Sequence, residues 1–138
     1  MGAVRKIRVA KKGGSVSFSA RIPKVTLDTL KAYAKEAGMS TGAAAVQLLE
    51  EALRMIRFPG IDFRWSPSGR QAYVTGTGLT AWEMFMIWDA HKRSAARLLK
   101  NYPHLKPGQI QAGATYLQAF PEELPSLEPP PGMPVVRI

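Results

Sequence analysis

Three polar side chains, Ser17, Ser19 and Arg21, recur at every second position in a short stretch near the start of the chain. In a β-strand, successive side chains point to opposite faces, so these three would share one face. Hydroxyl and guanidinium groups form hydrogen bonds with base edges in the major groove of DNA, and arginine binds guanine through two bonds at once. The chemistry that this spacing predicts is therefore the reading of a DNA sequence.

The opposite side of the same stretch is apolar and consists of Val16, Phe18, Ala20 and Ile22. This strict alternation over residues 15–22 predicts a strand, which Pro23 ends because proline has no amide hydrogen for a strand ladder. A single short strand is not stable alone, and no second strand follows within hairpin distance. We therefore expect this strand to pair with its counterpart in a second copy of the chain.

Two helices are predicted next, over residues 24–37 and 41–56, with Gly38 as a typical residue at the end of a helix. The apolar positions of the first are Leu27, Leu30 and Ala34. Those of the second, in register on a helix, are Val46, Leu49, Leu53 and Ile56. Each segment thus has the periodicity of an amphipathic helix.

The strand ending in Arg21-Ile22-Pro23, the two helices and the Gly38-Met39-Ser40 turn between them resemble the ribbon-helix-helix repressors, the family of Arc, MetJ and CopG. The resemblance covers residues 15–57 and implies a dimeric DNA-binding domain. It implies that the base-reading residues are Ser17, Ser19 and Arg21. It also implies a phosphate contact at the start of the second helix, through Ser40, Thr41 and Gly42.

The net charge of +9 is unevenly distributed along the 138 residues. Residues 1–60 carry eleven Lys and Arg against four Asp and Glu, whereas residues 121–138 carry one against three. A basic first half suits a nucleic-acid partner, and residues 1–14 are expected to form a flexible basic arm. The expected phosphate contacts are Lys11, Lys12 and Lys24. A second interpretation of Arg21 is that it caps the ribbon of paired strands or forms an ion pair with Asp28.

The break at Pro59-Gly60 predicts a second domain over residues 61–120. Alternation on both sides of residues 66–69 predicts a β-hairpin with a four-residue loop, and the Thr-Gly-Thr-Gly stretch after it predicts a flexible turn. Thr80 and Glu83 form a capping box for a helix over residues 81–91 that is too apolar for the surface. Two further helices are predicted over residues 94–102 and 107–120. Their inward positions are Ala95, Leu98, Leu99, Ile110, Ala114 and Leu117, and a candidate second basic face consists of Arg93, Arg97 and Lys100.

The hairpin, the Gly76-Thr77-Gly78-Leu79 step, the stretch from Leu98 to Leu105 and the Gln109–Ala112 helix start resemble a second family, the small domains of VapB-like antitoxins. The resemblance covers residues 61–124 and implies a three-helix, helix-turn-helix-like unit, often encoded beside a PIN-like toxin nuclease. Residues 121–138 form a proline-rich tail. It is either disordered or folds onto a partner, and its candidate toxin-binding residues are Val135, Val136 and Ile138.

Several classes of chemistry are not expected. The chain has no cysteine, which excludes a disulfide scaffold, a thiolate zinc site and a cysteine nucleophile. His91 and His104 lack carboxylates at ligand spacing, so no metal or other cofactor is expected. No nucleophile elbow, acid pair or phosphate loop is present, which argues against an enzyme. Neither a signal peptide nor a transmembrane run is found, so we expect a cytoplasmic protein without a membrane partner.

The sequence thus predicts an α+β protein, with a dimeric ribbon-helix-helix domain and a small hairpin-plus-three-helix domain. The expected function is a DNA-binding antitoxin that represses its own operon, forms a homodimer or higher assembly, and neutralises a PIN-like toxin. The alternative is a repressor without a toxin partner, of plasmid or phage type. A third class is a scaffold protein whose basic surface binds RNA without sequence preference.

Overall fold

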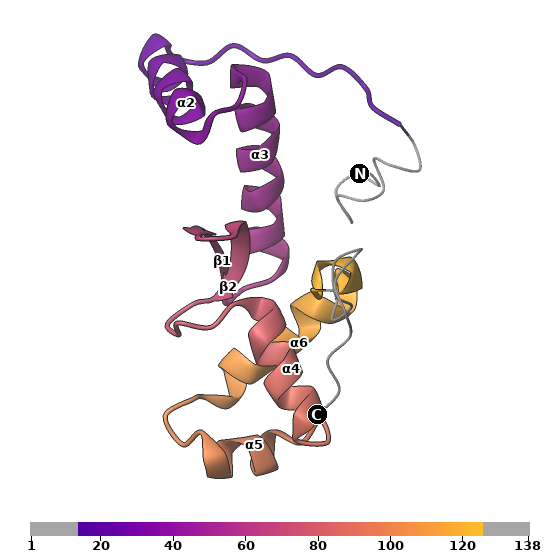
Figure 1. The fold of residues 1–138 in the computed structure, drawn as a ribbon. Coiled ribbons are helices and arrows are strands. Elements are labelled where there is room, and N and C mark those ends of the chain that lie inside the picture. Colours follow the sequence, from indigo (N-terminus) through magenta and orange to yellow (C-terminus); the bar gives the residue numbers. More distant parts are fainter. Residues whose placement is uncertain (1–13, 126–138) are drawn as a thin grey trace, which may run out of the picture. The chain divides into compact units, whose positions relative to one another are not determined.

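A computed structural model describes residues 14–125 of the chain (Figure 1). The fold is α+β, and the described residues contain five α-helices, one short 3-10 helix and one antiparallel hairpin. The chain divides into two compact units, Met1–Arg57 and Phe58–Ile138. The break predicted at Pro59-Gly60 therefore falls within three residues of the boundary between the units.

The described residues of the first unit form two helices, α2 (Lys24–Ala37) and α3 (Thr41–Arg57), preceded by an extended segment over residues 14–23 (Figure 1). Helix α2 has the predicted bounds, and it ends because Gly38 adopts a left-handed conformation with φ of 69°. The amide of Met39 then donates to the carbonyl of Ala34 at 2.9 Å, which closes the end of the helix. This turn brings α3 against α2.

The second unit begins with the hairpin of β1 (Ile61–Ser66) and β2 (Gly69–Val74). Ile61 pairs with Val74 and Ser66 with Gly69, so the loop has two residues rather than the four that the sequence predicted. The longer strands have a local cause, because the Ser66 hydroxyl donates to the Gly69 carbonyl at 2.8 Å and extends the pairing to the turn.

Three helices complete this unit: α4 (Ala81–Ala90), α5 (Ala95–Asn101) and α6 (Pro107–Ala119). Helices α4 and α6 pack against each other and against β2. They approach so closely at Gly113 that a Cβ atom there would lie 2.7 Å from the Met84 side chain. The 3-10 turn η2 (Pro121–Glu123) follows α6. The largest fully buried side chains are Tyr116, Phe120, Met84, Leu98, Ile110 and Val74.

The capping box at the start of α4 is confirmed. Glu83 donates its amide to the Thr80 hydroxyl at 3.1 Å, and the Thr80 amide donates to the Glu83 carboxylate at 2.9 Å. The predicted burial of this helix is wrong in degree, since only Ala81 and Met84 are fully buried and its aromatic residues are half-buried. The helix is apolar on nearly all sides, and β2, α5 and α6 cover only part of its circumference.

The apolar stripe predicted for α3 lies on an unexpected side. Val46, Leu49 and Ile56 are exposed, whereas the residues of α3 buried in the first unit are Ala44 and Glu51. Periodicity identifies an amphipathic face, but it does not identify what covers that face. In the single chain, the most apolar side of α3 faces away from its own partner helix.

Candidate nucleic-acid interface

The segment before α2 has the composition of a strand and no strand partner among the described residues. Residues 14–23 form no hydrogen-bonded ladder, and each is exposed. Ser17, Ser19 and Arg21, the predicted base readers, are thus accessible to a ligand. The strand itself stays a prediction, because a short strand needs a partner to supply its hydrogen bonds.

Arg21 and Lys24 occur in different surroundings, although both lie close to Pro23. Asp28 forms an ion pair with Lys24, whose Nζ atom lies 2.9 Å from the carboxylate. That pair is largely exposed and joins neighbouring turns of α2, so it stabilises little. The pairing of Arg21 with Asp28, considered above as an alternative, is not formed.

The start of α3 is capped by Ser40. Its hydroxyl accepts a hydrogen bond from the amide of Ala43 at 3.1 Å, which satisfies one of the first amides of the helix. The amides of Thr41 and Gly42 lie outside the hydrogen-bond ladder of the helix, as the first amides of any helix do. These two remain candidates for a phosphate contact, whereas the Ser40 side chain is occupied as a cap. Lys11 and Lys12 lie outside the described residues.

Most of the exposed large apolar side chains lie in the first unit. Of nine large apolar side chains that are exposed among the described residues, eight belong to this unit, and only alanines form its apolar interior. Val16 is 89 % exposed and Phe18 is 81 % exposed. An open groove of about 630 Å³ lies between Ile22 and the two helices, and it is lined by Ile22, Val25, Thr26, Thr29, Leu30, Tyr33, Ala45 and Leu48. This unit by itself does not form a closed core.

A hydrogen bond between side chains joins α2 to α3, and a second one continues along α3. The Tyr33 hydroxyl donates to Gln47 at 3.3 Å, and the Gln47 amide donates to Glu51 at 3.1 Å. Burial also raises the pKa of the neighbouring Glu50, against the attraction of Arg54, which lowers it. Sequence reasoning missed these contacts, because helix periodicity does not reveal which polar residue faces the interior.

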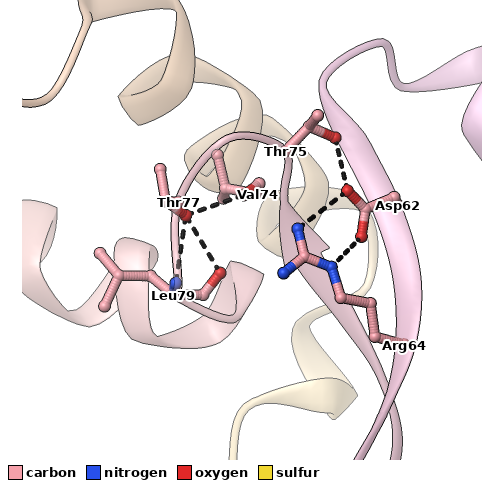
Figure 2. A network of polar contacts seen from close by, with 6 residues as sticks. All are labelled: Asp62, Arg64, Val74, Thr75, Thr77 and Leu79. Atoms are coloured by element: carbon pink, nitrogen blue, oxygen red, sulfur yellow. Dashed lines mark hydrogen bonds and ion pairs between the residues drawn. The ribbon is translucent and has the colours of Figure 1, made fainter.

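The loop after β2 is a fixed turn in the second unit (Figure 2). The Thr77 hydroxyl donates to the Val74 carbonyl at 2.8 Å and accepts the amide of Leu79 at 3.1 Å. Nearby, Asp62 accepts hydrogen bonds from Arg64 at 2.7 Å and from Thr75 at 2.8 Å. The bond from Arg64 is the largest reason that the pKa of Asp62 is lowered, and partial burial opposes it. These contacts explain why this threonine-glycine stretch ends the hairpin in an ordered turn.

The candidate second basic face of this unit is partly engaged. Arg93 forms an ion pair with Asp89 at 2.9 Å, and its guanidinium lies over the rings of Phe85 and Trp88. Arg97 and Lys100 are exposed on α5. The structure thus brings Arg97 and Lys100 to one helix surface and attaches Arg93 to α4. The residues Val135, Val136 and Ile138, predicted to bind a toxin, lie outside the described residues.

The two histidines make structural contacts. His91 contacts the Ile87 carbonyl through Nδ1 at 2.7 Å and the Asn101 side chain through Nε2 at 2.9 Å. Because a carbonyl only accepts, the Nδ1 atom carries the hydrogen. His104 lies beside the ring of Tyr102. Over residues 14–125, no three His, Asp or Glu side chains gather as metal ligands would.

No family model, no curated protein and no solved structure matches this chain significantly. Among the helices of residues 14–125, none has both the length and the apolar character needed to cross a membrane.

Proposed function

We propose that this protein is a dimeric ribbon-helix-helix transcriptional repressor that binds duplex DNA through its first unit. The observation that carries the proposal is the alternating, exposed segment over residues 15–22, followed by two helices whose apolar surface is uncovered. Exposed apolar patches of this kind mark interaction sites. A second copy of the chain supplies both missing elements, a strand and an apolar surface.

The pairing is two-fold symmetric in this proposal. Two antiparallel copies of residues 15–22 satisfy each other's backbone groups and place Val16, Phe18 and Ile22 of both copies on one face. That face covers the groove between α2 and α3 and the exposed side of α3, where Val46 and Leu49 are half-exposed in the single chain. The opposite face of the ribbon then presents Ser17, Ser19 and Arg21 from each copy to the DNA.

Recognition of sequence rests mainly on Arg21. It is the only residue on this polar face that can form a two-bond contact with guanine, which contributes about 1–3 kcal/mol of discrimination against another base. Serine hydroxyls bind bases with less selectivity. Phosphate contacts come from Lys24 at the start of α2 and from Thr41 and Gly42 at the start of α3. These contacts add affinity without sequence information.

The test is a binding titration on the protein's own upstream DNA, first mapped by footprinting, and on a scrambled duplex. Arg21→Ala is expected to reduce the ratio of specific to nonspecific affinity by about tenfold or more. Lys24→Ala should weaken both duplexes alike and lower the salt slope by about one unit. If Arg21→Ala leaves the ratio unchanged and lowers dimer stability instead, Arg21 supports the ribbon and does not read bases.

We further propose that the repressor is the antitoxin of a toxin-antitoxin operon. The resemblance of residues 61–124 to the domains of VapB-like antitoxins supports this role. The partner it implies is a PIN-like nuclease encoded by a neighbouring gene. Deletion of residues 126–138 is expected to spare DNA binding and impair neutralisation of that toxin. If no neighbouring gene encodes a nuclease with acidic active-site residues, the repressor without a toxin is favoured. If the protein prefers no duplex sequence over another, the RNA scaffold is favoured.

A further inference from the structure

The chain between α4 and α6 carries a concentrated positive charge. Residues 91–106 include five Lys and Arg and no Asp or Glu. These cations, all exposed, are Lys92, Arg93, Arg97, Lys100 and Lys106. We call residues 91–106 the basic corner. Arg97 and Lys100 lie on α5, and the other three cations lie on the turns before and after this helix. All five therefore belong to one continuous stretch of the second unit.

Most of this charge is uncompensated. Within residues 14–125, Arg93 is the cation of the basic corner that forms an ion pair, with Asp89 at 2.9 Å. No ion pair in that range involves the four other cations of the basic corner. A cluster of like charges raises the local potential and destabilises the compact state by repulsion, unless a ligand of opposite charge is bound.

The surface of the basic corner has the wrong composition for a protein partner. Protein interfaces have a core that is apolar and depleted of charge. Leu98 and Leu105 of the corner are buried, Leu99 and Tyr102 are half-buried, and none of the large exposed apolar residues lies between positions 91 and 106. A surface that offers cations without an apolar centre matches the phosphate backbone of a nucleic acid.

The corner is also held in a defined shape. Lys92 and Arg93 both have left-handed backbones, with φ of 58° and 56°, although neither is glycine. Residues with a Cβ atom rarely adopt this conformation, and such strain is concentrated at functional sites. Stacking of Arg93 on Phe85 and Trp88, and the contact of His91 with Asn101, fix the turn to both helices. Two strained positions thus carry positively charged side chains where glycine would fit without strain.

From these observations we infer that the basic corner is a second DNA contact, which binds the phosphate backbone of a duplex without sequence preference. Lys92, Arg97, Lys100 and Lys106 are the phosphate-binding residues, and Arg93 positions the turn through its stack. The inference rests on the proposed function, because it takes the ligand to be the same duplex DNA. It adds that the second unit extends the contact beyond the operator bases that the ribbon reads.

The experiment compares salt titrations of the full chain on the mapped operator duplex and on a scrambled duplex of equal length. In Arg97→Gln/Lys100→Gln, each lost phosphate contact is expected to lower the salt slope by about 0.9 on both duplexes. The ratio of specific to nonspecific affinity should stay the same. The matched control, Arg97→Lys/Lys100→Arg, preserves both charges and should preserve the slope. Thermal melting checks that both variants remain folded.

The outcomes separate this inference from the proposed function. An unchanged slope in the glutamine variant overturns the inference, and it does so whether or not Arg21→Ala abolishes operator preference. If the wild-type protein prefers no sequence, the repressor proposal fails, but a lower slope in the glutamine variant still supports the basic corner. A variant that binds both duplexes normally and loses an acidic protein partner assigns the corner to that partner and overturns the inference.

Discussion

The two units of this chain bury their apolar residues to very different degrees. The second unit has a closed core in which Tyr116, Phe120 and Met84 are at most 1 % exposed. Among the described apolar residues of the first unit, only Ala34 and Ala44 are buried, and Phe18 is almost completely exposed. The hydrophobic effect stabilises a domain in proportion to the apolar area that it removes from water. We therefore expect the second unit to fold alone, and the first to gain stability from the second copy that we propose.

Truncation of Tyr116 is expected to have the largest effect, because it removes the centre of the closed core. Its ring packs against Phe58, Phe63 and Phe120, and its hydroxyl donates to Glu123 at 2.9 Å. Tyr116→Ala should lower the free energy of unfolding by about 3–5 kcal/mol. Tyr116→Phe, which keeps the ring, should cost about 1 kcal/mol. Urea denaturation measures both, and a cost for the alanine variant as small as that for phenylalanine would contradict a closed core.

Replacement of Phe18 tests the other half of the comparison. In a single chain this side chain is 81 % exposed, so Phe18→Ser would have almost no effect on a monomer. In a paired ribbon its burial contributes about 2 kcal/mol per copy. Sedimentation at several concentrations should show the variant shifted toward monomer. Trp65→Ser is the control, because Trp65 is an exposed apolar residue of the second unit. Equal sedimentation of wild type and Phe18→Ser would show that the segment does not pair.

Lys92→Gly is expected to have a smaller effect of opposite sign. It removes a Cβ atom from a left-handed backbone and should stabilise the second unit by about 1 kcal/mol. Lys92→Ala keeps the Cβ atom and should leave the melting temperature unchanged. Both variants should lose the same share of the salt slope for DNA. Stabilisation by glycine with unaltered DNA binding would show that the strained turn has no role in binding.

How far the sequence predicted this fold depends on whether the relevant contacts are local. Gly38, the Thr80 capping box and Pro107 define helix ends through neighbours in sequence, and those ends agree with prediction to within about two residues. The side of α3 that faces α2 was not predictable, because Val46 and Leu49 have the periodicity of a buried face and yet are exposed in the single chain.

Among the candidate site residues, the hydrogen-bond partners were not predictable. Ser17, Ser19 and Arg21 are exposed, but so are Val16, Phe18 and Ile22 of the opposite face, so exposure does not distinguish the two faces. The capping role of Ser40 and the pairing of Lys24 with Asp28 depend on helix geometry, which turns nearby polar groups toward each other. The left-handed turn at Lys92 and Arg93 had no signal in the sequence, since such turns usually contain glycine.

The smallest predicted effect concerns the pH dependence of the second unit. The bond from Arg64 holds the pKa of Asp62 below its usual range, so the carboxylate is favoured in the folded state. Stability from this group is therefore present above the pKa of aspartate in the unfolded chain, and it is lost as the pH falls through the lower folded value. Because the ion pair is partly exposed, its contribution is small.

Asp62→Asn removes this titration while keeping an acceptor for Thr75. The wild type should melt at a slightly higher temperature than the variant at neutral pH, and the difference should shrink as the pH falls below the usual range of aspartate. Arg64→Gln removes the main cause of the shift and should show a similarly reduced pH dependence. Melting curves across this range provide the measurement. A difference between wild type and Asp62→Asn that stays constant with pH would mean that the Arg64 contact does not stabilise the charged form of Asp62.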